Sequence, residues 1–353
     1  MSVTRSVAHG SKSELQRRIA AGSQKTEDYL DLSDILGREL KFEEAKTLLN
    51  GALTLDIGNT EKAKIAVELG RLLYYYFDEP SRAISLAEEA IKLLSNEPET
   101  WDVMFLRALG SALIGECLWI TENQAASEAA STSLALLERL ILHAQEFEEM
   151  REVQYEAARV CNLLRETDRA IQLCEDCLGK PLTDEQRLSC LIIYGQALST
   201  KGQFLEAERV LKEALECVRI DERMLPLVHS ELGSTYRNAG HFFEARESFV
   251  LAMNALRALP TIGNNRHMLS QLYSQIAELC YELEEHDKAT RIFETVLQYH
   301  SESDLEYWTA VNWLGHCHNA EGNYDKAREC FDRVIKSPYA SDLDKQSARQ
   351  GLT

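Results

Sequence analysis

A spaced pattern of small and apolar residues recurs along this chain and limits the folds open to it. A small residue is followed twelve positions later by alanine, and further apolar residues stand four and seven positions after that alanine. Four consecutive copies fit: Gly195, Ala207, Leu211 and Ala214; Gly233, Ala245, Phe249 and Ala252; Ala277, Ala289, Phe293 and Val296; Gly315, Ala327, Phe331 and Val334. Two upstream copies have the same spacing: Ala158, Ala170, Cys174 and Cys177; Ser33, Ala45, Leu49 and Ala52. Six regular copies indicate a repeat protein.

Each copy is typical of a hairpin made of two amphipathic helices. In the segment 228–255, one helical face carries Leu232, Gly233 and Tyr236, and the second carries Ala245, Phe249 and Ala252. The turn at 239–241 separates the two faces. Small residues allow the two backbones to approach closely, and we expect the residue four after the alanine to fill the space toward the next repeat.

These residues resemble the tetratricopeptide repeat, a helical hairpin in which a small residue of the first helix meets an alanine of the second. The steps between the alanines at 170, 207, 245, 289 and 327 are 37, 38, 44 and 38 residues. The ordinary repeat is about 34 residues long. The resemblance is therefore to a long-repeat type, with helices longer than usual.

Two stretches fit the pattern less well. Gly70 and Ala83 stand thirteen apart because the turn at 76–80 is longer. Between Trp101 and His143 we expect a hairpin with a long first helix, and its alanine match at Ala130 is weak. Together the copies predict an all-α, right-handed α-solenoid of about eight helical hairpins, because a single hairpin leaves an apolar face that only stacking covers.

The chain divides into three expected parts. Residues 1–25 carry five basic residues against one acidic residue and read as a flexible tail, or alternatively as a docking peptide, although 14–21 suits a short helix. Residues 26–338 form the solenoid. Residues 339–353 are expected to form a helix that caps its open end, or alternatively the first helix of a further repeat. The segment 259–265 is the longest late break and is either a hinge or a tolerated surface insertion.

Composition narrows the classes of partner. The net charge of −19 disfavours direct binding to nucleic acid or to an anionic membrane, and it favours a basic or neutral protein partner. No apolar run approaches the ~20 residues that a spanning helix needs. Nine scattered cysteines and the lack of a secretory signal pattern indicate a cytoplasmic, reducing setting.

Motifs of catalysis and metal binding are not evident. The chain has no phosphate-binding glycine loop, nucleophile elbow, metalloprotease helix or kinase motif, so we expect no enzyme and no cofactor. Cys174 and Cys177 have metal-ligand spacing but fall on packing positions, which predicts core thiols. His316 and His318 point apart on a helix, which argues against a shared metal. In the aromatic run 72–77, at least one ring should be exposed.

The family resemblance implies where a partner binds. In tetratricopeptide arrays the first helices line a concave groove, through the residues three before and one, four and five after the small position. The matching residues here are Tyr155, Arg159, Asn162, Gln196, Ser199, Ser230, Ser234, Arg237, Asn238, Ser274, Glu278, Tyr281, Asn312, His316 and Asn319. Amides suit a peptide backbone, and the arginines suit a carboxylate.

The sequence therefore predicts a noncatalytic scaffold or adaptor that binds a protein segment in this groove. Family members that bind chaperone C-termini use a lysine and asparagine clamp, and Ser230, Ser234, Ser274 and Glu278 stand at those positions, so we do not expect a co-chaperone. Long repeats resemble cargo adaptors, polarity scaffolds and bacterial regulators. One alternative is a regulatory sensor whose peptide or other ligand controls an effector protein, such as a protease, kinase or transcription regulator. Another is an enzyme, or the targeting module of an enzyme.

Overall fold

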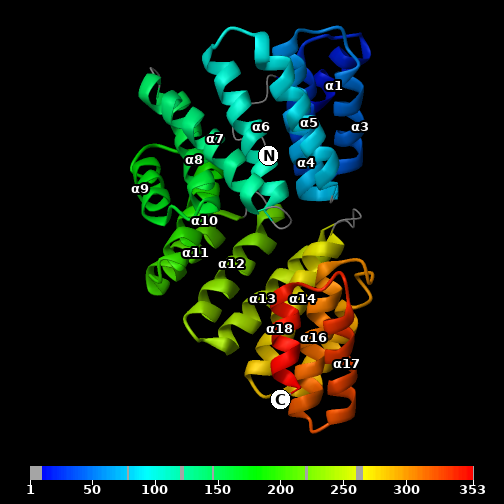
Figure 1. Ribbon diagram of the computed structural model, residues 1–353. Helices are drawn as coiled ribbons and strands as arrows, with labels where there is room; N and C mark the ends of the chain where they lie inside the picture. The colour runs from blue at the N-terminus through cyan, green and yellow to red at the C-terminus, as the bar shows by residue number, and fades with distance from the viewer. Residues whose placement is uncertain are drawn as a thin grey trace. The chain divides into compact units, whose positions relative to one another are not determined.

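The computed structural model describes residues 10–77, 79–119, 123–144, 147–218, 222–259 and 265–352 (Figure 1). Across these ranges the ordered secondary structure consists of α-helices and short 3-10 helices, with no strand. Consecutive helices pair as hairpins in the expected order, which confirms the prediction of an all-α stack of helical hairpins. None of the described helices is both long enough and apolar enough to cross a membrane.

The helices fall into two compact units. Unit 1 contains the first five hairpins and an additional helix before them. Its helices are α1 (Lys12–Ala20), α2 (Thr26–Arg38), α3 (Phe42–Leu53), α4 (Asn59–Phe77), α5 (Pro80–Leu93), η1 (Leu94–Asn96), α6 (Trp101–Leu118), α7 (Asn123–His143), α8 (Phe147–Leu163), α9 (Thr167–Leu178), α10 (Asp184–Thr200), α11 (Phe204–Cys217) and η3 (Glu222–Met224).

Unit 2 contains the remaining three hairpins and a final helix. Its helices are α12 (Leu225–Asn238), α13 (Phe242–Ala258), α14 (Asn265–Glu282), α15 (His286–Val296), α16 (Leu305–Ala320), α17 (Tyr324–Lys336) and α18 (Asp342–Gly351). The even-numbered helices α2 to α16 are the first helices of the hairpins in both units.

A bulky side chain packs onto a small residue of the first helix within the same hairpin. A β-carbon built on Gly233 of α12 would lie 2.7 Å from Cδ1 of Phe249 in α13. Gly195 meets Leu211 and Gly315 meets Phe331 in the same way. This residue therefore packs within its own hairpin as well as toward the next element expected from the sequence. Phe331 shows both contacts, because its ring also lies against Gly351 of α18.

The turn between the two helices has a constant backbone geometry in the six regular hairpins. The residue seven after each small position has positive φ: Leu40, Arg165, Gly202, Gly240, Glu284 and Gly322. In each case the next residue's N–H bonds a carbonyl one turn back, as from His241 to Tyr236 at 2.8 Å. This left-handed ending satisfies the last carbonyls of the first helix.

The two irregular hairpins also rely on close helix approach. In α6, Gly115 faces the backbone of Ala126 and Ala130 in α7, and Ala130 is fully buried. Gly70 of α4 faces the carbonyl of Ala83 in α5. Asp78 and residues 120–122, in the turns of these hairpins, lie outside the described residues. In the aromatic run, Tyr75 is 40% exposed, as expected of at least one ring.

Both ends of the described chain carry a short helix. Within the segment expected as a tail, α1 buries Leu15 against a cluster that includes Leu32 and Leu36, while residues 1–9 lie outside the described part. At the other end, α18 packs against α16 and α17 and buries Ala348. Residues 260–264, the expected hinge or insertion, also lie outside the described part, and the proposed boundaries at 25 and 338 stay predictions.

The contact between Gly233 and Phe249 leads to a stability prediction. Gly233→Ala forces a methyl group against the Phe249 ring, so we expect it to lower the free energy of unfolding by about 1–3 kcal/mol. Gly51→Ala is the matched control, because a β-carbon on this exposed helical glycine meets nothing within 4 Å. The control should be neutral or stabilising by up to about 1 kcal/mol. Urea unfolding followed by circular dichroism checks both, and equal effects would contradict the packing argument.

Candidate functional site

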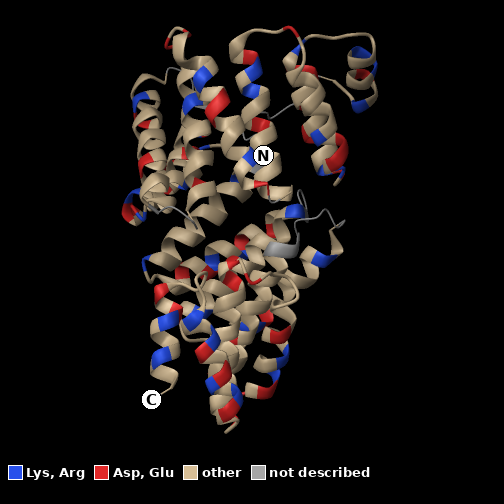
Figure 2. Cartoon of the chain, turned by 45° about the vertical axis from the view of Figure 1, so that its right-hand side comes forward, with Lys and Arg blue, Asp and Glu red and all other residues tan. Residues whose placement is uncertain are grey.

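The expected groove residues lie on the first helices α8 and α10 of unit 1 and α12, α14 and α16 of unit 2. Their exposure differs widely: Asn238 and Asn319 are exposed, Ser199 and Asn312 are buried, and the others are half-buried. Lys and Arg positions alternate with Asp and Glu positions along the helices of each unit (Figure 2). The contacts of each candidate therefore decide which side chains are available to a partner.

Several candidates connect one first helix to the next. Asn162 Nδ2 donates to the carbonyl of Ile193, which links α8 to α10 at 3.0 Å. The rings of Tyr281 and Trp313 meet edge to face at 5.4 Å, which links α14 to α16. His316 Nε2 lies 2.9 Å from Ser347 Oγ and links α16 to α18. These side chains stabilise the stack.

Arg159 belongs to a buried ionic network in unit 1. Its guanidinium donates to Glu156 at 2.7 Å and to Glu116 of α6. The second oxygen of Glu156 accepts from Arg71 of α4 at 3.3 Å, and Glu156 is only 1% exposed. Burial alone would lower the pKa of Arg71, but the carboxylate of Glu156 outweighs it, and the pKa is raised. Arg159 therefore already has carboxylate partners within the chain.

Arg237 and Glu278 pair with each other rather than standing apart. Arg237 of α12 donates to Glu278 of α14 at 3.2 Å. Burial raises the pKa of Glu278 even though the arginine opposes this shift. This pair connects successive first helices in unit 2, as the Arg159 network does in unit 1.

The remaining candidates offer free polar groups. Within the described part of the chain, no hydrogen bond or ion pair involves the side chains of Gln196, Ser230, Ser234, Asn238, Ser274 and Asn319. Ser199 Oγ and Asn312 Oδ1 are buried and also lack a described hydrogen-bond partner. Nothing in the sequence distinguishes these positions. In the structure, the six side chains without a described bond, which are half-buried or exposed, differ from the buried ones and from those that connect neighbouring helices.

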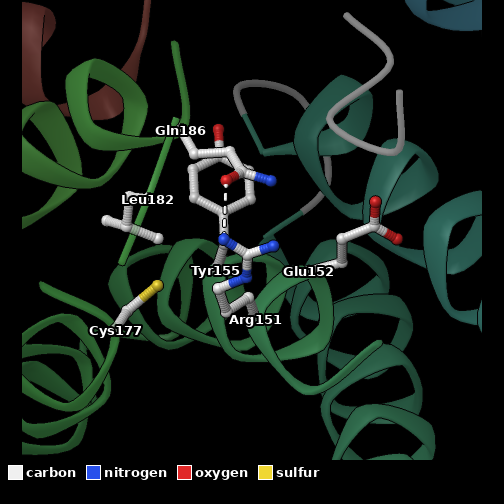
Figure 3. Close-up of a pocket in the computed structure, with 6 residues that line it drawn as sticks. All are labelled: Arg151, Glu152, Tyr155, Cys177, Leu182 and Gln186. Atoms are coloured by element: carbon white, nitrogen blue, oxygen red, sulfur yellow. Dashed lines mark hydrogen bonds between the residues drawn. The ribbon is translucent and has the colours of Figure 1, made fainter. Parts of the chain in front are cut away.

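Tyr155 lines a small pocket with Arg151, Cys177 and Gln186 (Figure 3). The Arg151 guanidinium fills its centre and donates to the Pro181 carbonyl at 2.7 Å and to Gln186 at 3.2 Å. The free volume of about 10 Å³ admits one water molecule at most. Burial raises the pKa of Tyr155. This pocket is a packing defect around an arginine rather than a ligand site.

A larger cavity in unit 1 was missed by sequence reasoning. It encloses about 260 Å³ between α2, α4, α6 and α8. Its lining consists of Leu30, Lys64, Val67, Glu68, Arg71, Trp101, Asp102, Phe105, Leu106, Leu109 and Glu152. The groove positions were carried over from regular hairpins only, whereas α4 and α6 belong to the irregular ones. The positions three before and one after Gly70 are Val67 and Arg71, which both line the cavity. Applying the groove pattern to Gly70 would therefore have pointed to it.

One side-chain cluster in unit 2 resembles a hydrolase triad. Ser270 Oγ lies 2.5 Å from His300 Nε2, and His300 Nδ1 lies 3.9 Å from Asp304. Ser270 is only 2% exposed, so a substrate carbonyl has no access to its hydroxyl. Asp304 accepts instead from the Ser301 backbone N–H at 2.7 Å. The cluster therefore fastens the loop before α16 to α14 rather than supplying a nucleophile.

The cysteines and histidines singled out by the sequence have structural partners. Cys174 and Cys177 are buried with Cys190 in one hydrophobic cluster, as expected of core thiols. His318 Nδ1 faces Glu321 at 3.4 Å, whereas His316 contacts Ser347. Among the described residues, no group of three or more potential ligands is placed to hold a metal ion.

Comparison with known proteins supports the repeat assignment. Residues 275–341 match the family model of the tetratricopeptide repeat. A search of curated protein sequences found no match.

Two solved structures share the fold over almost the whole chain. A Rap protein complexed with the competence and sporulation factor matches at 14% identity and a TM-score of 0.61, covering 94% of this chain and 97% of that one. A signal transduction ATPase with numerous domains from Pyrococcus horikoshii, which has a tetratricopeptide repeat sensor, matches at 15% identity and a TM-score of 0.60. That alignment covers 95% of this chain and 49% of the ATPase. Identities this low establish a shared fold only.

The buried network leads to a second stability prediction. Glu156→Gln removes the charge that Arg71 and Arg159 share, so we expect a loss of about 3 kcal/mol or more in the free energy of unfolding. Arg291→Gln breaks the exposed pair with Asp287 and should cost about 0.5 kcal/mol or less. Chemical denaturation of both variants measures the difference. A loss for Glu156→Gln no larger than that of the control would contradict the network's structural role.

His316 makes unit 2 sensitive to acid. Burial lowers the pKa of His316, so the unfolded chain binds a proton that the folded chain does not. Stability should therefore fall as the pH drops below the ordinary histidine pKa of about 6.5. His316→Gln should weaken this dependence in urea midpoints measured between pH 7.5 and 5.5. His143→Gln, at an exposed position of α7, should leave it unchanged, and identical curves for wild type and His316→Gln would contradict the argument.

Proposed function

Because the chain is built of tetratricopeptide repeats, we propose that it is a noncatalytic scaffold that binds a segment of another protein on its first helices. The observation that carries this proposal is the division among the first-helix residues. One set already bonds neighbouring helices, and a second set of polar side chains has no partner within the described chain. Ser230, Ser234 and Asn238 of the second set recur every four residues on α12, so they share one helical face.

The chemistry of these free groups suits an extended polypeptide. An amide offers both a donor and an acceptor, and a hydroxyl does the same, so both can bond backbone N–H and C=O groups. The stack presents them on helices whose positions are fixed by packing, which limits the entropy lost on binding. With nine free cysteines and a strongly acidic composition, we place this scaffold in the cytoplasm with a basic or neutral protein partner, not nucleic acid or a membrane.

A regulatory role is the second candidate. The similar Rap protein was solved with the competence and sporulation factor, and the similar ATPase carries its repeats as a sensor. A regulator would bind a ligand on the first helices and change its affinity for an effector protein. The two roles differ in one measurable respect. A second ligand changes the affinity of a regulator for its effector protein, whereas the affinity of a scaffold for its partner does not depend on a second ligand.

Affinity purification from the source cells, with mass spectrometry, tests the scaffold. Ser234→Lys combined with Asn238→Lys alters α12 in unit 2, and Gln196→Lys alters α10 in unit 1. At least one of these variants should lose a wild-type partner about tenfold, the change that ~1.4 kcal/mol of binding free energy produces.

The matched control adds the same charge to the second helix of the same hairpin. Leu251→Lys combined with Asn254→Lys changes two exposed residues of α13 and should retain the partner. If the control loses the partner while both first-helix variants keep it, binding occurs on the outer helices and the proposal is wrong.

A further inference from the structure

The cavity of unit 1 combines apolar walls with an aromatic edge. Leu30, Val67 and Leu106 are at most 7% exposed and form part of its walls. Trp101 and Phe105 lie one turn apart on α6, with ring centroids separated by 4.9 Å. Such a surface accommodates the methylene stem of a long side chain, or a planar cationic group stacked on an aromatic ring.

The charges of the lining leave the cavity anionic. Lys64 pairs with Glu61 at 3.2 Å, and Arg71 pairs with Glu156 at 3.3 Å. Lys64 also lies 3.8 Å from Asp102, which lines the cavity. Arg71 is matched by a carboxylate outside the lining. The lining holds three carboxylates, Glu68, Asp102 and Glu152, against the two cations Lys64 and Arg71.

Glu68 is the carboxylate best placed to receive a ligand. It is half-buried on α4, and no hydrogen bond or ion pair within the described ranges involves its side chain. A carboxylate on a partly apolar wall gains more from a cation than one in bulk water, because the local dielectric constant is lower. The charge of Arg71 acts on Glu68 from within the same lining, but no cation of the described chain bonds the Glu68 carboxylate. A guanidinium or ammonium group of a ligand can supply that bond.

The chain itself already packs a guanidinium against α2, one of the helices that line the cavity. Arg223 of η3 is 7% exposed and lies on α2, where a β-carbon built on Gly37 would be 2.9 Å from its Nη1. Burial raises the pKa of the neighbouring Asp34, the charge of Arg223 opposes that shift, and Glu68 adds to it. Helix α2 thus accepts a buried arginine close to Asp34.

Trp101 offers a second recognition group. Its Nε1 is buried and donates no hydrogen bond to any described acceptor. An indole N–H is a donor only, so its natural complement is a carbonyl oxygen. A polypeptide supplies both complements, a side-chain cation and a backbone carbonyl.

We propose that this cavity binds an arginine or lysine side chain of the partner segment, with its head group on Glu68 and its stem against Trp101 and Phe105. This inference rests on the proposed function and names the chemistry of the partner. Acidic side chains are disfavoured, because three carboxylates line the cavity against two cations. A free amine lacks the carbonyl that Trp101 bonds, so it binds more weakly than a peptide.

A peptide library with the full chain tests this proposal. The probes are labelled, N-acetylated and C-amidated hexapeptide pools in which one position is fixed as arginine, lysine, citrulline or glutamate. Binding is followed by fluorescence anisotropy, with free arginine and spermidine as competitors. Pools with arginine or lysine at the preferred position should bind about tenfold more tightly than citrulline pools, since a hydrogen-bonded charge pair replaces a neutral one.

Two variants and one control locate the effect. Glu68→Gln should abolish the preference for arginine over citrulline, and Trp101→Phe should weaken every pool while the preference remains. Glu88→Gln removes an exposed carboxylate from the second helix α5 and should change neither result. Thermal melting checks that each variant is folded. If Glu68→Gln does not fold, Trp101→Phe still tests whether the peptides bind in the cavity.

The outcomes separate this inference from the proposed function. Pools that bind equally well with arginine and with citrulline, or an arginine preference that survives Glu68→Gln, overturn the basic-residue site but leave the scaffold in place. If spermidine binds as tightly as the best peptide pool, the cavity binds free polyamines and the proposed peptide occupant is wrong. Failure of every pool to bind overturns both proposals.

Discussion

The contact between a bulky side chain and a small residue on the neighbouring helix is the constraint on which the stack depends. Phe249 on Gly233, Leu211 on Gly195 and Phe331 on Gly315 set how closely the two helices of a hairpin approach. The left-handed turn residue seven positions after the small residue then directs the second helix back along the first. The close contact and the turn together fix how the two helices of a regular hairpin lie against each other.

That arrangement explains why so many first-helix polar groups bond each other. Asn162 reaches the backbone of α10, Arg237 reaches Glu278, and the Arg71–Glu156–Arg159 network joins α4 to α8. Burying these charges is unfavourable unless they are paired, so removal of one member leaves the others uncompensated. A surface held in this way is preorganised, and a partner meets groups that are already in place. The unit 1 cavity lies where the two irregular hairpins, α4–α5 and α6–α7, interrupt the regular pattern.

The spacing of small residues and alanines was enough to predict the fold, because only small residues fit where two helices pack closely. The turn geometry was harder to predict from the sequence. Positive φ is typical of glycine, yet Leu40, Arg165 and Glu284 also adopt it. Sequence reasoning also treated Arg159 and Asn238 as equivalent groove residues. It had no means to separate them, because the partners of Arg159 include a residue 43 positions away on another helix, Glu116. The cavity was missed for a simpler reason: Gly70 was set aside as irregular.

We propose that partners bind the first helices and not the second ones. Photo-crosslinking in the source cells tests it most directly, with benzoylphenylalanine placed at Asp102 of α6 and Ser234 of α12. Leu142 of α7 and Leu251 of α13 are exposed second-helix positions of the same hairpins and serve as references. We expect a crosslink to a partner protein from at least one first-helix position and none to that partner from the references. Crosslinks from Leu142 or Leu251 alone would contradict it.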